Sequence, residues 1–332
     1  MSRAEAGDAV PDAPAPMQGD PEQAGPEPAV PEAPAFVHTP YDGSRQAFAI
    51  ALAPLDLDEW IEPDPHLARH LAEREALLDQ RREVVFREEA SSRDAQREAL
   101  WLIVDHVVVR WPAIYRLEGR RLTVVPTDRS FDLDDEGEAP LAIAGRIVPD
   151  DLLILTRGEA GYRLTAAVLC FPSAWSLAER FGQTLDGLHE AVPGYQAKLS
   201  RVMNRIFENL KVDQPVWRVN WSIYPDDALH HPESKERPRD WFADPDDPAP
   251  EAFVRVERQT LRRMPASGDM LFTVRIHVDP FSAFRRHPQG RELAASLREQ
   301  ILALDPDQLA YKALTEHRDA VADALERIAR GG

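Results

Sequence analysis

Three stretches of the sequence decide the fold: Val216-Trp-Arg-Val-Asn-Trp-Ser-Ile223, Phe253-Val-Arg-Val-Glu-Arg-Gln-Thr-Leu-Arg-Arg263 and Met270-Leu-Phe-Thr-Val-Arg-Ile-His-Val278. Each is rich in β-branched and aromatic residues. Apolar and polar residues alternate along each stretch, which is typical of a strand with two different faces. We therefore expect three long strands in this part of the chain.

Shorter strands and several helices are expected around these stretches. Alternation about turn residues predicts two hairpins, one over 114–118 with 121–125 and one over 152–156 with 162–169. Helical spacing of apolar residues predicts helices over 66–80, between Ser91 and Pro112, over 174–181 and 195–210, and from Arg291 onward. Strands and helices do not alternate as regular βαβ units. The pattern therefore predicts an α+β protein with an antiparallel sheet flanked by helices and a helical C-terminal segment.

The three long strands each carry a polar row opposite an apolar row. The polar rows are Arg218, Asn220 and Ser222; Arg255, Glu257 and Gln259; and Thr273, Arg275 and His277. If these rows meet, they would line a charged pocket in which Glu257, Arg218 and Arg255 form an ion-paired cluster. The alternative is a solvated face, which spacing alone favours because antiparallel sheets often expose one side.

Composition narrows the class of protein. The net charge of −18 opposes binding to nucleic acid, and no apolar run is long enough to span a membrane. Cys170 is the single cysteine, which fits a reducing, cytoplasmic location and leaves no thiolate set for an iron–sulfur cluster. Residues 1–40 hold nine prolines and seven acidic residues, so we expect a disordered acidic tail, with ordered structure beginning near Phe48.

One histidine has an unusual position. His189 lies in Thr184-Leu-Asp-Gly-Leu-His-Glu-Ala-Val-Pro-Gly194, where Thr184 can cap a short helical turn. A histidine on such a turn can serve as an axial ligand to haem iron. Trp175 and Phe181 are near enough in sequence to supply apolar walls for a macrocycle. The alternative is a histidine without a metal, which is the better reading of one histidine taken alone.

Two other groups carry side chains of metal-ligand type, and we expect neither to bind a metal. The adjacent pair His230-His231 lies in a polar, proline-rich loop, and neighbouring residues rarely converge on one ion, so we expect both to be exposed. Cys170 ends an apolar strand, so a buried inert thiol is expected there.

Several motifs, in order along the chain, resemble one known family. They are Phe171-Pro-Ser-Ala-Trp175, Gly182-Gln-Thr-Leu185, Leu188-His-Glu-Ala-Val-Pro193, Arg218-Val-Asn-Trp221, Arg255-Val-Glu-Arg-Gln-Thr-Leu-Arg-Arg-Met-Pro265, Leu271-Phe-Thr-Val-Arg275 and Tyr311-Lys312. Together they resemble the alpha subunit of the haem-dependent oxidative N-demethylases. The resemblance covers residues 45–315, with 316–332 left as a C-terminal helix. Ala191 and Leu188 depart from it, where the family has proline and isoleucine.

The resemblance implies a PAS-like fold that holds haem b noncovalently. It implies an oxygenase component of a heteromeric complex, which demethylates a small secondary amine such as dimethylamine with O2 to give a primary amine and formaldehyde. Electrons would come from NADPH through separate flavin and iron–sulfur subunits, and tetrahydrofolate takes part in the complex. The other possibility is a haem-PAS module that senses oxygen or redox state without turnover.

The resemblance also suggests roles for single residues. His189 would be the haem ligand, with Trp175 and Phe181 beside the cofactor. Glu257, Arg218 and Arg255 would form a polarised catalytic wall, in which the carboxylate holds the substrate's ammonium group and the guanidinium groups stabilise reduced oxygen.

Overall fold

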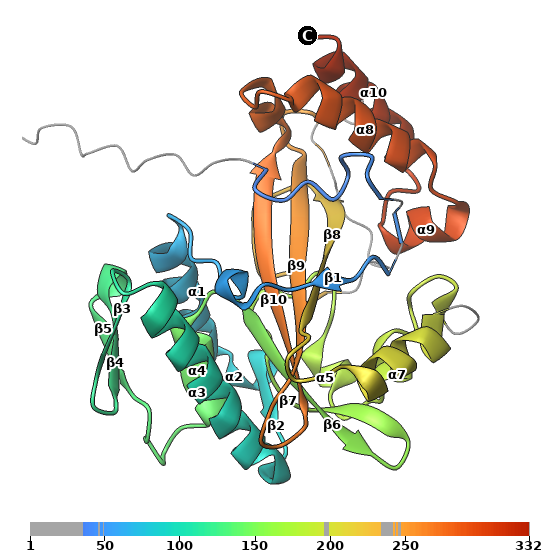
Figure 1. Ribbon diagram of the computed structural model, residues 1–332. Helices are drawn as coiled ribbons and strands as arrows, with labels where there is room; N and C mark the ends of the chain where they lie inside the picture. The colour runs from blue at the N-terminus through green and yellow to red at the C-terminus, as the bar shows by residue number, and fades with distance from the viewer. Residues whose placement is uncertain are drawn as a thin grey trace, which may run out of the picture. The chain divides into compact units, whose positions relative to one another are not determined.

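A seven-stranded antiparallel sheet organises the chain, with its strands in the order β1-β8-β9-β10-β6-β7-β2 (Figure 1). The three long strands are β8 (Val216–Tyr224), β9 (Phe253–Arg263) and β10 (Met270–Pro280), and they lie side by side. The shorter strands are β1 (Ala53–Pro54), β2 (Phe86–Glu88), β6 (Asp151–Gly158) and β7 (Gly161–Val168). This computed structural model describes residues 36–45, 47–48, 50–195, 199–233, 242, 244 and 247–331.

Helices flank this sheet, and a second, three-stranded sheet lies beside them. The small sheet is formed by β3 (Tyr115–Glu118), β4 (Arg121–Val124) and β5 (Arg129–Asp132). The helices are α1 (Leu67–Gln80), α2 (Arg82–Val85), α3 (Arg93–Arg110), α4 (Pro140–Ile147), α5 (Leu177–Arg180), α6 (Leu185–Leu188), α7 (Ser200–Asn209), α8 (Gly290–Leu302), α9 (Pro306–Tyr311) and α10 (Arg318–Ala329). No helix in the described ranges is both long and apolar enough to cross a bilayer.

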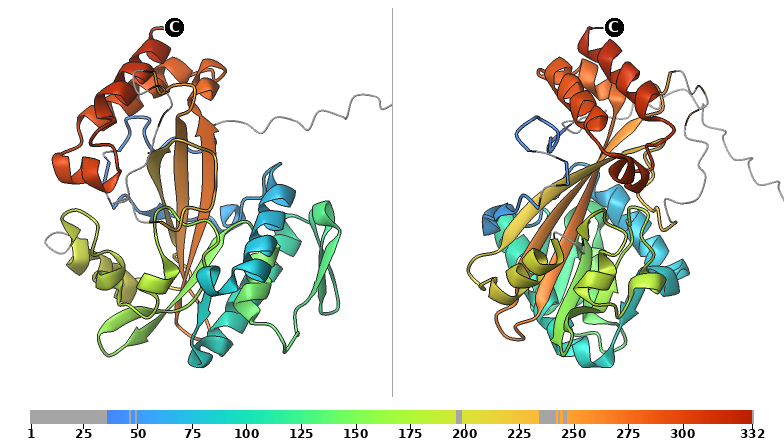
Figure 2. Two further views of the ribbon diagram at one scale, coloured as in Figure 1. Left: turned by 180° about the vertical axis from the view of Figure 1, so that it is seen from behind. Right: turned by 90° about the vertical axis from the view of Figure 1, so that its right-hand side faces the viewer.

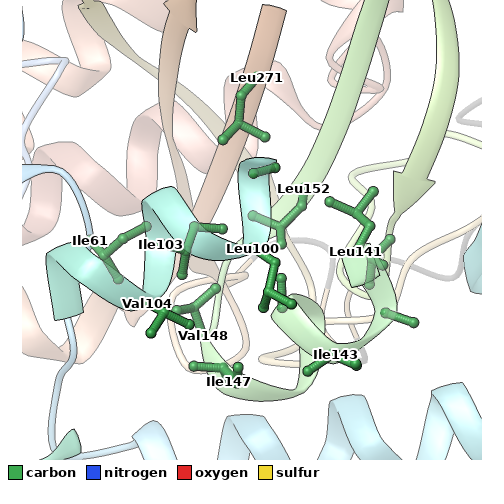
Figure 3. Packing of buried hydrophobic residues seen from close by; sticks show 14 of the residues in the cluster. Ile61, Leu100, Ile103, Val104, Leu141, Ile143, Ile147, Val148, Leu152 and Leu271 are labelled. Atoms are coloured by element: carbon green, nitrogen blue, oxygen red, sulfur yellow. The ribbon is translucent and has the colours of Figure 1, made fainter. Parts of the chain in front are cut away.

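The largest core lies between the sheet and helices α1, α3 and α4. Figure 3 shows Leu100 and Ile103 of α3 packed toward Leu152 of β6, with side chains of α4 beside them. Helix α4 approaches β7 so closely that a Cβ at Gly145 would stand 2.6 Å from Val168 Cγ1. Only glycine allows this contact, so helix α4 and the sheet are held at a fixed spacing.

A second core lies under the C-terminal helices. Figure 2 shows α8 and α10 at one end of the long strands. Buried residues of these helices form a core with Phe281 and Phe284. Phe36 stacks on Phe284 at a ring-centroid distance of 4.3 Å, and Tyr41 is also buried. The packed unit therefore begins well before Phe48. Of the predicted tail, residues 1–35 lie outside the described residues.

The predicted α+β class is confirmed, with a large antiparallel sheet, flanking helices and a C-terminal helix. The predicted strands and hairpins are present, and the first hairpin gains a third strand, β5, from Arg129–Asp132. The helix predicted over 174–181 is shorter than expected and forms α5. The helix predicted over 195–210 contains α7, and its residues 196–198 lie outside the described residues. The segment between the two contains α6. The comparison with a PAS fold stays a prediction.

Candidate functional site

The sheet register brings two of the three polar rows together. Arg218 pairs with Gln259 and Asn220 pairs with Glu257 across β8 and β9, so their side chains share one face. In β10 the partner of Glu257 is Ile276, which places the apolar row Phe272, Val274 and Ile276 on that same face. The polar rows of β8 and β9 therefore meet, as the charged-pocket alternative requires, whereas the polar row of β10 does not join them. That row lies on the opposite face.

A cavity of about 270 Å³ lies over this mixed face. The sheet supplies its floor, and its walls come from α6, α7, the 171–175 segment, and Phe48, Ile50 and Leu52. The lining side chains are mostly aliphatic and aromatic: Phe48, Ile50, Leu52, Leu153, Leu155, Leu169, Phe171, Trp175, Leu185, Leu188, Val192, Leu199, Met203, Phe207, Leu261, Phe272, Val274 and Ile276. The polar lining residues include His189, Tyr195, Arg218, Asn220, Glu257, Gln259 and Tyr311. A mainly apolar cavity with a few convergent polar groups is the usual form of a small-molecule site.

His189 is held in position by its own short helix. The Thr184 hydroxyl accepts a hydrogen bond from the Gly187 amide and caps α6, and His189 is the residue that ends the helix. Its Nδ1 is 2.8 Å from the Leu185 carbonyl oxygen, which makes Nδ1 the protonated nitrogen. The ring also stacks on Tyr195, with ring centroids 4.8 Å apart and planes 8° apart. Two independent contacts thus fix the ring.

The other nitrogen of His189 is available as a ligand atom. Within the described part of the chain, Nε2 has no hydrogen-bond partner. Burial lowers the pKa of His189, and the nearby Arg218 charge adds to this, while the bond to Leu185 opposes it. The imidazole is therefore neutral at physiological pH, with its free lone pair in a residue that lines the cavity.

Arg218 and Glu257 lie together on the polar side of the floor. Gln259 Nε2 donates to Glu257 Oε2 at 2.8 Å, so one carboxylate oxygen is fixed. Burial lowers the pKa of Arg218, although the Glu257 charge acts in the opposite direction. Arg218 Nε is buried and, among the described residues, has no hydrogen-bond partner. Such an orphaned donor at a cavity wall is satisfied when an anionic or oxygen-bearing ligand binds.

Arg255 is not one of the residues that line the cavity. Its guanidinium is buried, and it donates to Ser173 Oγ and to the carbonyl oxygens of Phe171, Pro172, Ala228 and Leu229 at 2.9 to 3.3 Å. These contacts hold the turn over residues 170–173, hereafter the 170–173 turn. The structure thus separates Arg255 from Arg218 and Glu257, and gives it a positioning role.

The same turn is held from two further directions. Asp151 accepts from the backbone amides of Cys170 and Phe171 and forms a 2.7 Å ion pair with Arg74. His230 Nδ1 is 2.7 Å from the Cys170 carbonyl. His230 and His231 are both half-buried, so the expectation that they are exposed is wrong. Residues 228–231 contact the turn and Arg255 instead of extending into solvent.

The remaining predicted residues also fall into two groups, those that line the cavity and those that do not. Trp175 lines the cavity, whereas Phe181 packs in the adjoining core without reaching the cavity lining. Cys170 is buried, as expected, and burial raises the pKa of its thiol to about 12. Asn220, Tyr195 and Tyr311 were not predicted as site residues. Asn220 was recoverable from its place on the polar row. Tyr195 and Tyr311 reach the cavity only through tertiary contacts.

The fold and the cavity define a class of protein: an α+β protein with a mainly apolar cavity whose polar lining includes a neutral histidine and a hydrogen-bonded carboxylate. The chain belongs to the family described as haem-dependent oxidative N-demethylase, alpha subunit-like, whose model matches residues 51–322. The match includes nearly every residue that lines the cavity and confirms the resemblance of the motifs.

Proposed function

We propose that the cavity binds haem b noncovalently, with His189 as the residue that would hold its iron, and that the protein is the oxygenase component of an oxidative N-demethylase. The observation that carries the proposal is the state of His189. It is a neutral, doubly fixed imidazole on the cavity lining with one nitrogen free, which is what ligation to haem iron requires.

The donor set of the cavity fits a haem. The Nδ1–H bond to the Leu185 carbonyl fixes the tautomer and leaves Nε2 as the ligating atom. Trp175, Phe272 and the surrounding aliphatic side chains supply apolar surface for a macrocycle. Arg218, with its unpartnered Nε, supplies a donor for a carboxylate or for oxygen. The volume of about 270 Å³ lies below the ~300–1,000 Å³ of small-molecule sites, so the cavity walls would have to move apart to admit a macrocycle.

The reaction we propose converts a secondary amine such as dimethylamine, with O2, NADPH and a proton, into a primary amine, formaldehyde, NADP⁺ and water. The haem, when bound, supplies the redox centre for oxygen reduction. Electrons arrive from partner flavin and iron–sulfur proteins, since one cysteine cannot ligate a cluster in this chain. Tetrahydrofolate is the proposed further participant in the complex.

The protein's own residues would bind and orient the amine. A secondary amine is protonated at neutral pH, and the Glu257 carboxylate, held by Gln259, is positioned to pair with its ammonium group. The apolar row of β10 would face the methyl groups. Arg218 would stabilise negative charge that develops on oxygen, and its low exposure to water strengthens that effect.

The test is the haem spectrum of a His189→Ala variant, compared with a His66→Ala control in which an exposed histidine is removed. We expect His189→Ala to lose the Soret band of the ligated form and most of its haem, while the control keeps both. An unchanged spectrum and full haem content in His189→Ala would refute the assignment. The absence of formaldehyde from a haem-loaded protein supplied with electrons, O2 and dimethylamine would refute the reaction.

A further inference from the structure

A second group of metal-ligand side chains lies on the opposite face of the sheet from the cavity. His38 comes from the N-terminal segment, Glu62 from the turn before α1, and His277 from the polar row of β10. One ligand atom from each residue lies within 4.8 Å of the other two. Three residues far apart in the sequence therefore converge on one point.

The arrangement of these three side chains is close to that of a metal site. His38 Nε2 is 2.8 Å from Glu62 Oε2, and His277 Nε2 is 3.9 Å from the same oxygen. Tetrahedral ligands at ~2.1 Å from a zinc ion stand about 3.4 Å from one another, so small shifts of these side chains suffice to enclose an ion. The ring centroids of His38 and His277 are 5.1 Å apart and the ring planes are inclined at 70°, so the two rings approach the Glu62 carboxylate from different directions.

His277 has a buried ring nitrogen without a hydrogen-bond partner among the described residues. The nitrogen is Nε2, and the side chain is only 11% exposed. A buried unsatisfied ring nitrogen costs free energy unless something binds it.

The carboxylate of the group has a fixed orientation. Glu62 Oε1 lies 3.0 Å from Arg258 Nε in an ion pair, which leaves Oε2 on the side of the two histidines. Arg258 is itself anchored by the carbonyl oxygens of Trp60 and Glu59, and it packs over the Trp217 ring. Partners that orient a ligating carboxylate in this way are typical of metal sites. The neighbouring Arg275 is paired with Asp64, so its charge is largely compensated.

We propose that His38, Glu62 and His277 form a binding site for a divalent transition-metal ion such as Zn²⁺, separate from the proposed haem. Two imidazoles and one carboxylate are a ligand set that Zn²⁺ and Fe²⁺ both accept, with the remaining positions taken by water. The ion would tie the N-terminal segment to β10 and to the entry of α1. Phe48, Ile50 and Leu52, further along that segment, line the cavity, so the ion would steady one cavity wall.

The experiment is a Zn²⁺ titration of untagged, full-length protein that has been freed of metal with a chelator and kept at a fixed haem content. Competition with a chromophoric chelator gives the stoichiometry and affinity. Co²⁺ provides a second readout, because its visible absorption reports ligand type and geometry. We expect a single tight Zn²⁺ site per chain and a Co²⁺ spectrum with nitrogen ligands.

The variants His38→Gln and Glu62→Gln should each weaken Zn²⁺ binding by at least ~10–100-fold, the loss that removal of even an outer-shell partner can bring. His38→Gln is the safer variant for folding because it lies on the N-terminal segment. His66→Gln, which removes an exposed histidine nearby, is the matched control and should bind as the native chain does. The proposal is overturned if no saturable site is found, or if His38→Gln binds as tightly as the control. The haem spectrum of these variants, measured alongside, reports separately on the proposed function.

Discussion

Replacing Arg255 with methionine should destabilise the protein while leaving the floor of the cavity in place. Its guanidinium donates five hydrogen bonds. Three of them are buried, and the two of these to the carbonyl oxygens of Phe171 and Leu229 are the shorter, at 2.9 Å. A buried acceptor left unsatisfied costs ~1–3 kcal/mol, so the loss of two gives about 2–6 kcal/mol. This is a large part of the ~5–15 kcal/mol by which domains are stable. Methionine fills a similar volume, so the substitution leaves little empty space and adds little further loss of stability.

The assay is urea denaturation followed by tryptophan fluorescence at a fixed haem content, with the variant Glu257→Gln measured in parallel. Glu257→Gln keeps the shape of the side chain and removes only a charge on a half-buried group, so we expect a change below about 1 kcal/mol. Arg255→Met should shift the midpoint downward without changing the slope of free energy against denaturant. If Arg255→Met unfolds within 1 kcal/mol of the native protein, the positioning role of Arg255 is wrong.

Three further predictions concern binding, pH and thiol chemistry. Glu257→Gln should weaken the binding of dimethylamine to the haem-loaded protein more than it weakens haem binding; equal amine affinity in the two proteins would count against the proposed ammonium contact. His70 is buried, and burial together with Arg275 lowers its pKa to about 2, so the unfolded chain takes up a proton below pH ~6.5 that the folded chain refuses. Stability should therefore fall as pH drops, by up to about 2 kcal/mol at pH 5 from this residue, and a His70→Gln variant should show a flatter pH profile in the same denaturation assay. Cys170, with its pKa raised to about 12, should not react with a thiol reagent in the native protein and should react fully in denaturant; rapid native labelling would contradict its burial.

The sequence predicted the strands well because alternation reports directly on which face a side chain occupies. It therefore placed Arg218 and Glu257 correctly on one face of neighbouring strands. It could not show that β10 presents its apolar row to that face, because pairing register is a tertiary property. For the same reason Arg255 was grouped with Glu257, although the carbonyl oxygens of the 170–173 turn occupy its guanidinium.

The position of His189 was predictable, and its environment only in part. Thr184 and Gly187 encode the capped turn locally, so the short helix before the histidine follows from the sequence. The stacking partner Tyr195 and the lining residue Tyr311 depend on chain packing, which local patterns do not report. The same limit applies to the group of His38, Glu62 and His277, whose members are separated by 24 and 215 positions.

The mixed floor of the cavity has a consequence for how any flat guest molecule would sit on it. Charged and amide side chains run along β8 and β9, and hydrocarbon side chains run along β10 and β6, so the floor differs from one edge to the other. A planar guest with one hydrophilic edge can match this surface in one orientation only. Turned over, it would press its hydrophilic edge against Phe272 and Val274 and leave Arg218 against hydrocarbon, with desolvation penalties on both sides. The sheet therefore acts as a template that selects one of two otherwise equivalent ways of inserting an asymmetric ring.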